Sequence, residues 1–357
     1  MQTASLRLTA ADFDRPNFAI LQAIEPQLIL AFFSMAAVRH ERVLRGLKPA
    51  FPGARVIGCS TAGEIAQDGV SDDGLVLVAL RFAQPNFRAV SAPLQTMEAS
   101  AAAGAALAAA LKAPDLRSVL LFAPGVAING SALIDGLAAG VGAGVTITGG
   151  LAGDGGSFGG WQPFGPVRKV TRAAGNLLYE LDGEAALDIY RRYLGDYAKD
   201  LPGSGLLFPF AMLGPDHRDI GLIRTILGID EAQGSVILAG DVEAGGYLRL
   251  MHASTNALIE GAEAAAQAAQ SMRSHRRSGL AILVSCVGRK LVMGGRVDEE
   301  IEAVAEVFGQ GATITGFYSN GEISPFVAAQ DCRLHNQTMT ITYLSEREPG
   351  GETRHAP

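Results

Sequence analysis

The chain has 357 residues, which exceeds the usual size of one hydrophobic core and predicts two domains. Hydrophobic residues make up 48% and charged residues 18% of the sequence, a composition that excludes intrinsic disorder. The formal net charge of −7 repels phosphate backbones, so nucleic acid is not an expected partner.

The sequence favours a cytoplasmic protein. Its three cysteines form no CxxC pair, which is typical of a reducing compartment. The N-terminus lacks the apolar segment of a secretory signal. No uncharged apolar run approaches the roughly 18 residues of a membrane span. We therefore expect no membrane span.

The predicted elements repeat as three strand–helix–strand units. Their strands are expected at 27–34 and 55–59, at 118–123 and 144–148, and at 279–286 and 311–316. A further strand is expected at 73–82. Ser131 is predicted to cap the helix of the second unit, and Asp298 that of the third.

The second strand of each unit opens into a glycine-rich acidic loop. GCSTAGEI at 58–65 and GFYSNGEI at 316–323 share glycine, hydroxyl residue, glycine, glutamate and isoleucine at one spacing. The middle copy, GGLAGD at 149–154, is one residue shorter and ends in Asp154. Repetition of the same loop after the same elements predicts related substructures.

The segment between the second and third units has a different pattern of predicted elements. Its expected elements are a hairpin at 167–180, a helix at 183–194, a hairpin at 222–239, a strand at 247–252 and a helix at 254–272. The predicted fold is α/β, with two lobes of mixed sheets flanked by helices. The predicted domains are 25–183 and 184–345, followed by a flexible tail at 346–357.

The acidic loops and several later segments resemble the FIST family of bacterial sensory domains. The two loops at 58–65 and 149–154 resemble the FIST N-terminal domain. ALDIYRRYLG (186–195), GLIRTILGID (221–230), AGDV (239–242), GFYSNGEISPF (316–326) and CRLHNQTMTITYL (332–344) resemble the C-terminal domain. The resemblance implies a sensor that signals to a histidine kinase, a chemotaxis receptor or a cyclic-dinucleotide enzyme. It implies either an amino acid-like ligand or haem that senses nitric oxide.

The loops supply the candidate ligand-binding residues. An amino acid needs a carboxylate for its ammonium group and N–H donors for its own carboxylate, and glycines let it approach the backbone. The residues predicted to bind ligand are Ser60, Thr61, Gly63, Glu64, Gly150, Asp154, Ser319, Gly321 and Glu322. The alternative is that each acid caps a neighbouring turn.

Haem would need an axial ligand in apolar surroundings, for which His335 and His252 are the candidates. Neither histidine lies in a CxxCH motif, so covalent haem is excluded. The alternative for each is a hydrogen-bonded structural role.

An enzyme is the rival interpretation. Glu64 or Glu322 would act as general acid or base of a hydrolase or transferase in a crevice between the lobes. The sequence contains no phosphate-binding loop and no HExxH motif, so no catalytic residue is assigned and a non-enzymatic sensor is the expectation.

Overall fold

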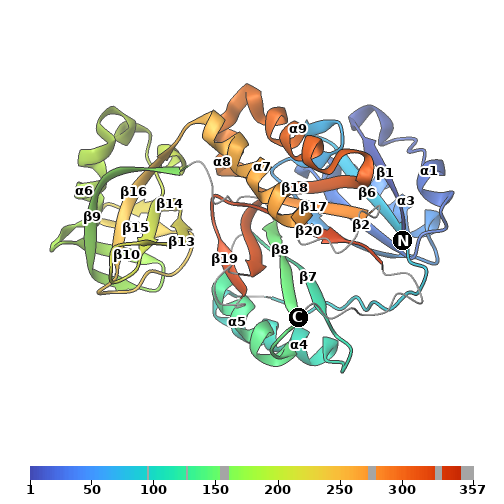
Figure 1. The fold of residues 1–357 in the computed structure, drawn as a ribbon, viewed down its shortest axis with the longest axis horizontal. Helices are drawn as coiled ribbons and strands as arrows, with labels where there is room; N and C mark the ends of the chain where they lie inside the picture. The colour runs from blue at the N-terminus through green and yellow to red at the C-terminus, as the bar shows by residue number, and fades with distance from the viewer. Residues whose placement is uncertain (95, 126–127, 153–160, 272–278, 326–331, 347–357) are drawn as a thin grey trace.

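The computed structural model describes residues 1–94, 96–125, 128–152, 161–271, 279–325 and 332–346 (Figure 1). The α/β class is confirmed: mixed sheets flanked by helices form two lobes. The small lobe contains the strands between residues 161 and 253, and the large lobe contains the strands and helices on either side of that segment. Across the described part of the chain, no helix has the length and apolar character that crossing a membrane requires.

The large lobe is built on two sheets that pack face to face. The first sheet has the order β1 (Gln2–Leu8), β6 (Leu75–Arg81), β2 (Leu28–Phe33) and β3 (Arg55–Ser60). The second sheet has the path β20 (Met339–Leu344), β17 (Gly279–Cys286), β18 (Ala312–Pro325), β4 (Glu64–Ala66) and β5 (Gly69–Ser71). Strands β19 (Cys332–His335), β8 (Thr146–Ala152) and β7 (Ser118–Ala123) extend it: β19 and β8 pair with β18, and β7 pairs with β8.

The core between these sheets explains why the strands are apolar on both faces. Alternate residues of β2 and β6, such as Leu30, contact β17 and β18. Phe32 stacks on Phe317 with ring centroids 4.9 Å apart. The intervening residues, such as Ile29, face helices instead. The result is a layered helix–sheet–sheet–helix lobe.

Helices cover the outer faces of both sheets. α1 (Ala19–Gln22), α2 (Met35–Arg39) and α3 (Glu41–Ala50) cover the first sheet, whereas α7 (Thr255–Ser271) and α9 (Val297–Phe308) cover β17 and β18. α4 (Ser100–Leu111) and α5 (Gly130–Val141) pack on β7, β8 and β19.

The three predicted strand–helix–strand units are present, and each contains a parallel strand pair: β2 with β3, β7 with β8, and β17 with β18. The equivalent glycines of the three units, Gly58, Gly149 and Gly316, each press on the backbone of the partner strand. A Cβ atom there would lie 1.8 to 1.9 Å from a carbonyl oxygen. One close approach repeated at one position supports a common structural plan.

Two local predictions differ from the structure. The second helix is capped by Asn129, whose side chain accepts a hydrogen bond from Ala132 N, rather than by Ser131. Asp298 lies inside the first turn of α9, and its carboxylate accepts from Val70 N at 2.8 Å, so it joins the helix to β5.

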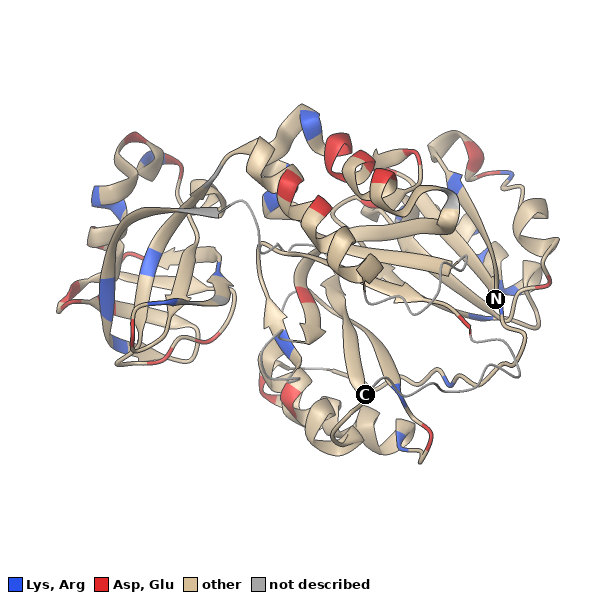
Figure 2. Ribbon diagram, viewed as in Figure 1, with Lys and Arg blue, Asp and Glu red and all other residues tan. Residues whose placement is uncertain are grey.

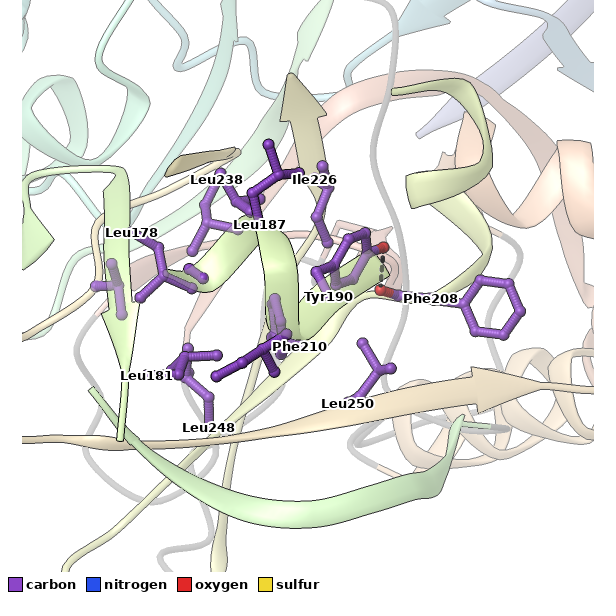
Figure 3. Close-up of a cluster of buried hydrophobic side chains, with 14 of the residues drawn as sticks. Leu178, Leu181, Leu187, Tyr190, Phe208, Phe210, Ile226, Leu238, Leu248 and Leu250 are labelled. Carbon is purple, nitrogen blue, oxygen red and sulfur yellow. Dashed lines mark hydrogen bonds between the residues drawn. The ribbon is translucent and has the colours of Figure 1, made fainter. Parts of the chain in front are cut away.

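The small lobe is a curved sheet of the order β13, β12, β16, β9, β10, β15, β14, with β11 paired to β10. Their bounds are β9 Trp161–Ala174, β10 Leu177–Leu181, β11 Glu184–Ala185, β12 Phe210–Leu213, β13 Asp219–Arg224, β14 Ile226–Asp230, β15 Ser235–Leu238 and β16 Tyr247–Ala253. Helix α6 (Ala186–Leu194) fills the concave side with Leu187 and Tyr190, which pack on Leu178, Phe210 and Leu250 (Figure 3).

The predicted domain boundary at residue 183 falls between β10 and β11, within the small lobe. The second sheet of the large lobe combines β4, β5, β7 and β8 with β17 to β20. Strands from both predicted domains therefore share a sheet, and the division at that position stays a prediction. Residues 347–357 of the predicted tail lie outside the described residues.

Candidate functional site

The predicted acidic loops lie next to one another in the second sheet. Strand β18 pairs with β4 on one side and with β8 further along, so that Phe317 lies opposite Glu64, and Glu322 opposite Gly150. Backbone bonds from Ala62 N to Tyr318 O and from Tyr318 N to Gly63 O tie two of the loops together. Asp154, in the third loop, lies outside the described residues.

The loop predicted at residues 317–323 is part of strand β18. Because β4, β8 and β19 offer backbone groups on its two sides, this glycine-containing segment stays extended instead of turning away. A register shift between Ser319 and Gly321 marks a bulge at the acidic motif.

The carboxylate of Glu64 is enclosed by donors from its own surroundings. Its Oε1 accepts from Thr61 Oγ1 at 2.5 Å, and its Oε2 accepts from Ser71 Oγ at 2.9 Å and Gly74 N at 3.1 Å. Ser60 lies half-buried just before this turn. The Glu64 side chain is fully buried, and burial raises the pKa of the carboxyl group although the hydrogen bonds oppose the rise.

Glu322 repeats this arrangement. Its Oε1 accepts from Ser319 Oγ at 2.9 Å, and its Oε2 accepts from Thr338 N at 3.0 Å and Thr338 Oγ1 at 2.6 Å. Glu322 is also fully buried. In both copies a hydroxyl three residues earlier binds one carboxylate oxygen, and a later segment of chain binds the other. The shared sequence motif thus has a shared hydrogen-bond pattern.

The glycines of the two turns have side chains of other residues packed close to them. A Cβ atom on Gly63 would lie 2.6 Å from Lys290 Nζ, and one on Gly321 would lie 2.8 Å from Leu334. Gly63 also has φ of +145°, which disfavours other residues. Protein atoms therefore occupy the space beside these glycines, and ligand contact at the nine predicted residues stays a prediction.

Lys290, from α8 (Val287–Met293), closes over the first turn. Its Nζ donates to Ala62 O at 2.9 Å and forms an ion pair with Asp72. Burial lowers the pKa of Lys290, and the charge of Glu64 opposes that change. The lysine holds α8 against the Thr61–Glu64 turn.

A buried polar network lies at the carboxyl end of β17, beside the middle of β18. Glu300 accepts from Ser285 Oγ at 2.8 Å, from Tyr318 OH at 2.9 Å and from Arg289 Nε at 2.7 Å. Arg289 also donates to Leu258 O at 2.8 Å. Both charged side chains are fully buried, so this ion pair fixes the positions of α8 and α9 on the sheet.

The two haem-ligand candidates have opposite environments. His335 is 3% exposed, its Nε2 hydrogen-bonds to Ser324 O at 3.2 Å, and burial lowers its pKa to about 4. Iron coordination through that nitrogen would break the bond. His252 is exposed, and its ring lies 5.7 Å from that of Phe208 and 6.1 Å from that of Phe164. The imidazole of His252 is therefore accessible beside aromatic rings, whereas that of His335 is enclosed.

Other reactive groups are sparse in the described residues. They contain no cluster of three or more His, Cys, Asp or Glu side chains placed to bind a metal ion. The three cysteines are buried, and burial raises the pKa of the thiols of Cys59 and Cys332, the latter to about 12, which keeps them protonated. A small apolar cavity of about 10 Å³, beside Tyr190 and Tyr193 in the small lobe, holds at most one water molecule.

The lobes contact each other where β19 and the following turn meet the small lobe. Gln337 Nε2 donates to Leu206 O at 3.1 Å, from η4 (Gly203–Leu207), and β13 lies against β19 (Figure 1). Arg224 at the end of β13 is 6% exposed. The sequence analysis missed Arg224, Arg289 and Lys290. The signal for Arg224 was a charged residue within an apolar strand, LIRTILGI.

Comparison with known proteins agrees with this architecture. Residues 27–159 and 155–184 match the family model of the FIST N domain, and residues 186–325 match that of the FIST C domain. A search of curated proteins finds no match. FIST domains are generally sensory domains that bind small ligands.

Proposed function

Because the chain belongs to the FIST family, we propose that it is a cytoplasmic sensor that binds a small ligand and passes the signal to a separate partner. The observation that carries the proposal is the position of β19. This strand pairs with the acidic segment of β18 and also lies against β13 of the small lobe. A ligand bound there would change the contact between the lobes, and a partner that touches both lobes would read that change.

The proposed ligand is amino acid-like, and its proposed contacts are groups of the three loops other than the carboxylates of Glu64 and Glu322. The buried carboxylates of Glu64 and Glu322 already hold three hydrogen bonds each from their surroundings. We therefore assign them the role of fixing the turns, and we assign ligand contact to backbone groups and to polar side chains at the lobe contact.

The proposed partner is a histidine kinase, with a chemotaxis receptor or a cyclic-dinucleotide enzyme as the other classes. Acidic residues gather on the outer faces of α7 and α9 (Figure 2). They are Glu260, Glu263, Glu299, Glu302 and Glu306. This face would complement a basic surface of the partner.

Thermal denaturation of the purified chain with single amino acids tests the sensor proposal. A ligand that binds only the native state raises the melting temperature, by an amount that increases with its concentration. The same ligand is expected to change autophosphorylation of the cognate kinase while being recovered unaltered. A ligand that shifts the melting temperature but is consumed would favour the hydrolase or transferase, and no shift with any compound would refute the proposal.

Haem is the second candidate ligand, favoured by the exposed His252 beside Phe164 and Phe208. We expect titration with hemin to give a Soret band that is lost in His252→Ala and retained in His335→Ala. Retention in both variants would exclude these two histidines as ligands, and the absence of a band in the native chain would exclude haem.

A further inference from the structure

Arg224 is a buried cation with an incomplete set of partners. Its Nε donates to Asp241 O at 2.9 Å and its Nη1 donates to Ile223 O at 3.1 Å. Both acceptors are uncharged backbone carbonyls. Among the described residues, no carboxylate forms an ion pair with Arg224, although the side chain is 6% exposed. A guanidinium carries five N–H donors, so these two bonds leave further donors to be satisfied.

The surroundings of Arg224 are closely packed and contain charges of both signs, Asp241 and Arg333. A Cβ atom on Gly240 would lie 3.0 Å from the guanidinium carbon, so the glycine backbone forms one wall. Burial lowers the pKa of Arg224, and the charge of Arg333, across the lobe contact, lowers it further. The carboxylate of Asp241 opposes both, and the pKa falls to about 10. Arg224 stays protonated at neutral pH, so a buried positive charge remains to be balanced.

Strand β19, which lies against β13, contains Arg333 and His335 and leads into a buried polar turn. The charges of Arg224 and Arg333 add to burial in keeping His335 neutral. The next residue, Asn336, is 1% exposed, and its amide oxygen has no hydrogen-bond partner in the part of the chain that the structure describes. The carboxylate of Glu322, opposite His335 in the sheet, is held by Ser319 and Thr338.

We propose that Arg224 of the small lobe and Arg333 of the large lobe bind the oxyanion group of a ligand, a carboxylate or a phosphate, and that this anion joins the two lobes. The proposal rests on the proposed sensor function and names the charged group that the sensor recognises. A planar guanidinium binds an oxyanion through two parallel hydrogen bonds, and in Arg224 the two backbone carbonyls leave donors for such bonds. Because the two arginines belong to different lobes, the bound anion would strengthen the lobe contact.

Calorimetric titration of the full chain tests the site. The probes are L-glutamate, acetate and inorganic phosphate, each at one ionic strength set with sodium chloride; the first two distinguish a carboxylate from a phosphate source. We expect saturable binding of at least one probe. We expect Arg224→Gln to raise its Kd at least about 30-fold, since at least one of the two charge-assisted bonds, each of about 2 kcal/mol, is lost. Arg333→Gln, an exposed substitution, should raise Kd about tenfold.

Arg172→Gln is the matched control, because it removes one positive charge from the same lobe at an exposed ion pair with Glu180. Its Kd should equal that of the native chain. If Arg224→Gln does not fold, the site is tested with Arg333→Gln and Arg224→Lys. The lysine keeps the charge but not the planar pair of donors. Unchanged binding in both would overturn the proposal, as would the absence of saturable binding to the native chain.

The outcomes separate this site from the sensor proposal. If an amino acid raises the melting temperature of the native chain and Arg224→Gln equally, the sensor proposal stands and the anion site is refuted. If an oxyanion binds through Arg224 but leaves kinase activity unchanged, the anion site stands and the proposed signalling fails.

Discussion

Replacing Glu322 by glutamine distinguishes a turn-fixing carboxylate from a ligand-binding one. Glu322 accepts three hydrogen bonds, one from Ser319 and two from Thr338, and it is fully buried. In its best orientation, glutamine keeps an oxygen toward Thr338 and turns its NH2 group toward Ser319 Oγ, which can accept. All three contacts survive, but each changes from a charge-assisted bond to a neutral one.

The expected cost follows from that change. A hydrogen bond to a charged group contributes about 1.5–3 kcal/mol and a neutral one about 1 kcal/mol, while the neutral amide is easier to bury. We therefore expect Glu322→Gln to lower the free energy of unfolding by about 2 kcal/mol. Urea denaturation followed by circular dichroism at pH 7 measures it.

Glu302→Gln, an exposed substitution on α9, is the control and should change the free energy of unfolding by less than about 0.5 kcal/mol. If Glu322→Gln is as stable as the native chain but no longer responds to ligand, the carboxylate serves the ligand and the assignment made here is refuted. If both variants lose equal stability, the hydrogen-bond reasoning fails.

Three further predictions concern single positions. Lowering the pH from 6.5 toward 4 should reduce the free energy of unfolding by about 3 kcal/mol through His335, because the unfolded chain binds a proton that the folded chain excludes. In His335→Gln, the free energy of unfolding should vary less with pH over this range. Gly149→Ala should lower the free energy of unfolding, measured by urea denaturation, by more than about 3 kcal/mol. Its Cβ atom would lie 1.9 Å from a backbone oxygen, and its φ is +136°. The control Gly53→Ala should have little effect, because no atom lies within 4 Å of the added Cβ. Tyr190→Phe removes the 2.8 Å bond to Phe208 O seen in Figure 3 and should lower the melting temperature by the equivalent of about 1–2 kcal/mol; an unchanged melting temperature would mean that this bond contributes nothing.

The sequence predicted secondary structure and local hydrogen bonds wherever a short segment determines its own structure. Apolar runs gave the strands of the three units, and the repeated spacing of glycine, hydroxyl and glutamate predicted turns that share one hydrogen-bond pattern. A hydroxyl and a carboxylate three residues apart can bond whatever surrounds them. The sequence also raised the alternative that the acids serve their own turns, which is how the structure engages Glu64 and Glu322.

Only the tertiary structure decided which groups meet across long separations. Strand β18 pairs with β4, β8 and β19, so the two acidic motifs lie in one sheet although they are hundreds of residues apart in the sequence. The strands that carry Arg224 and Arg333, β13 and β19, lie against each other across the lobe contact, and no local pattern links them. Burial and charge at such a contact depend on the packing of whole sheets, a property that no window of sequence contains.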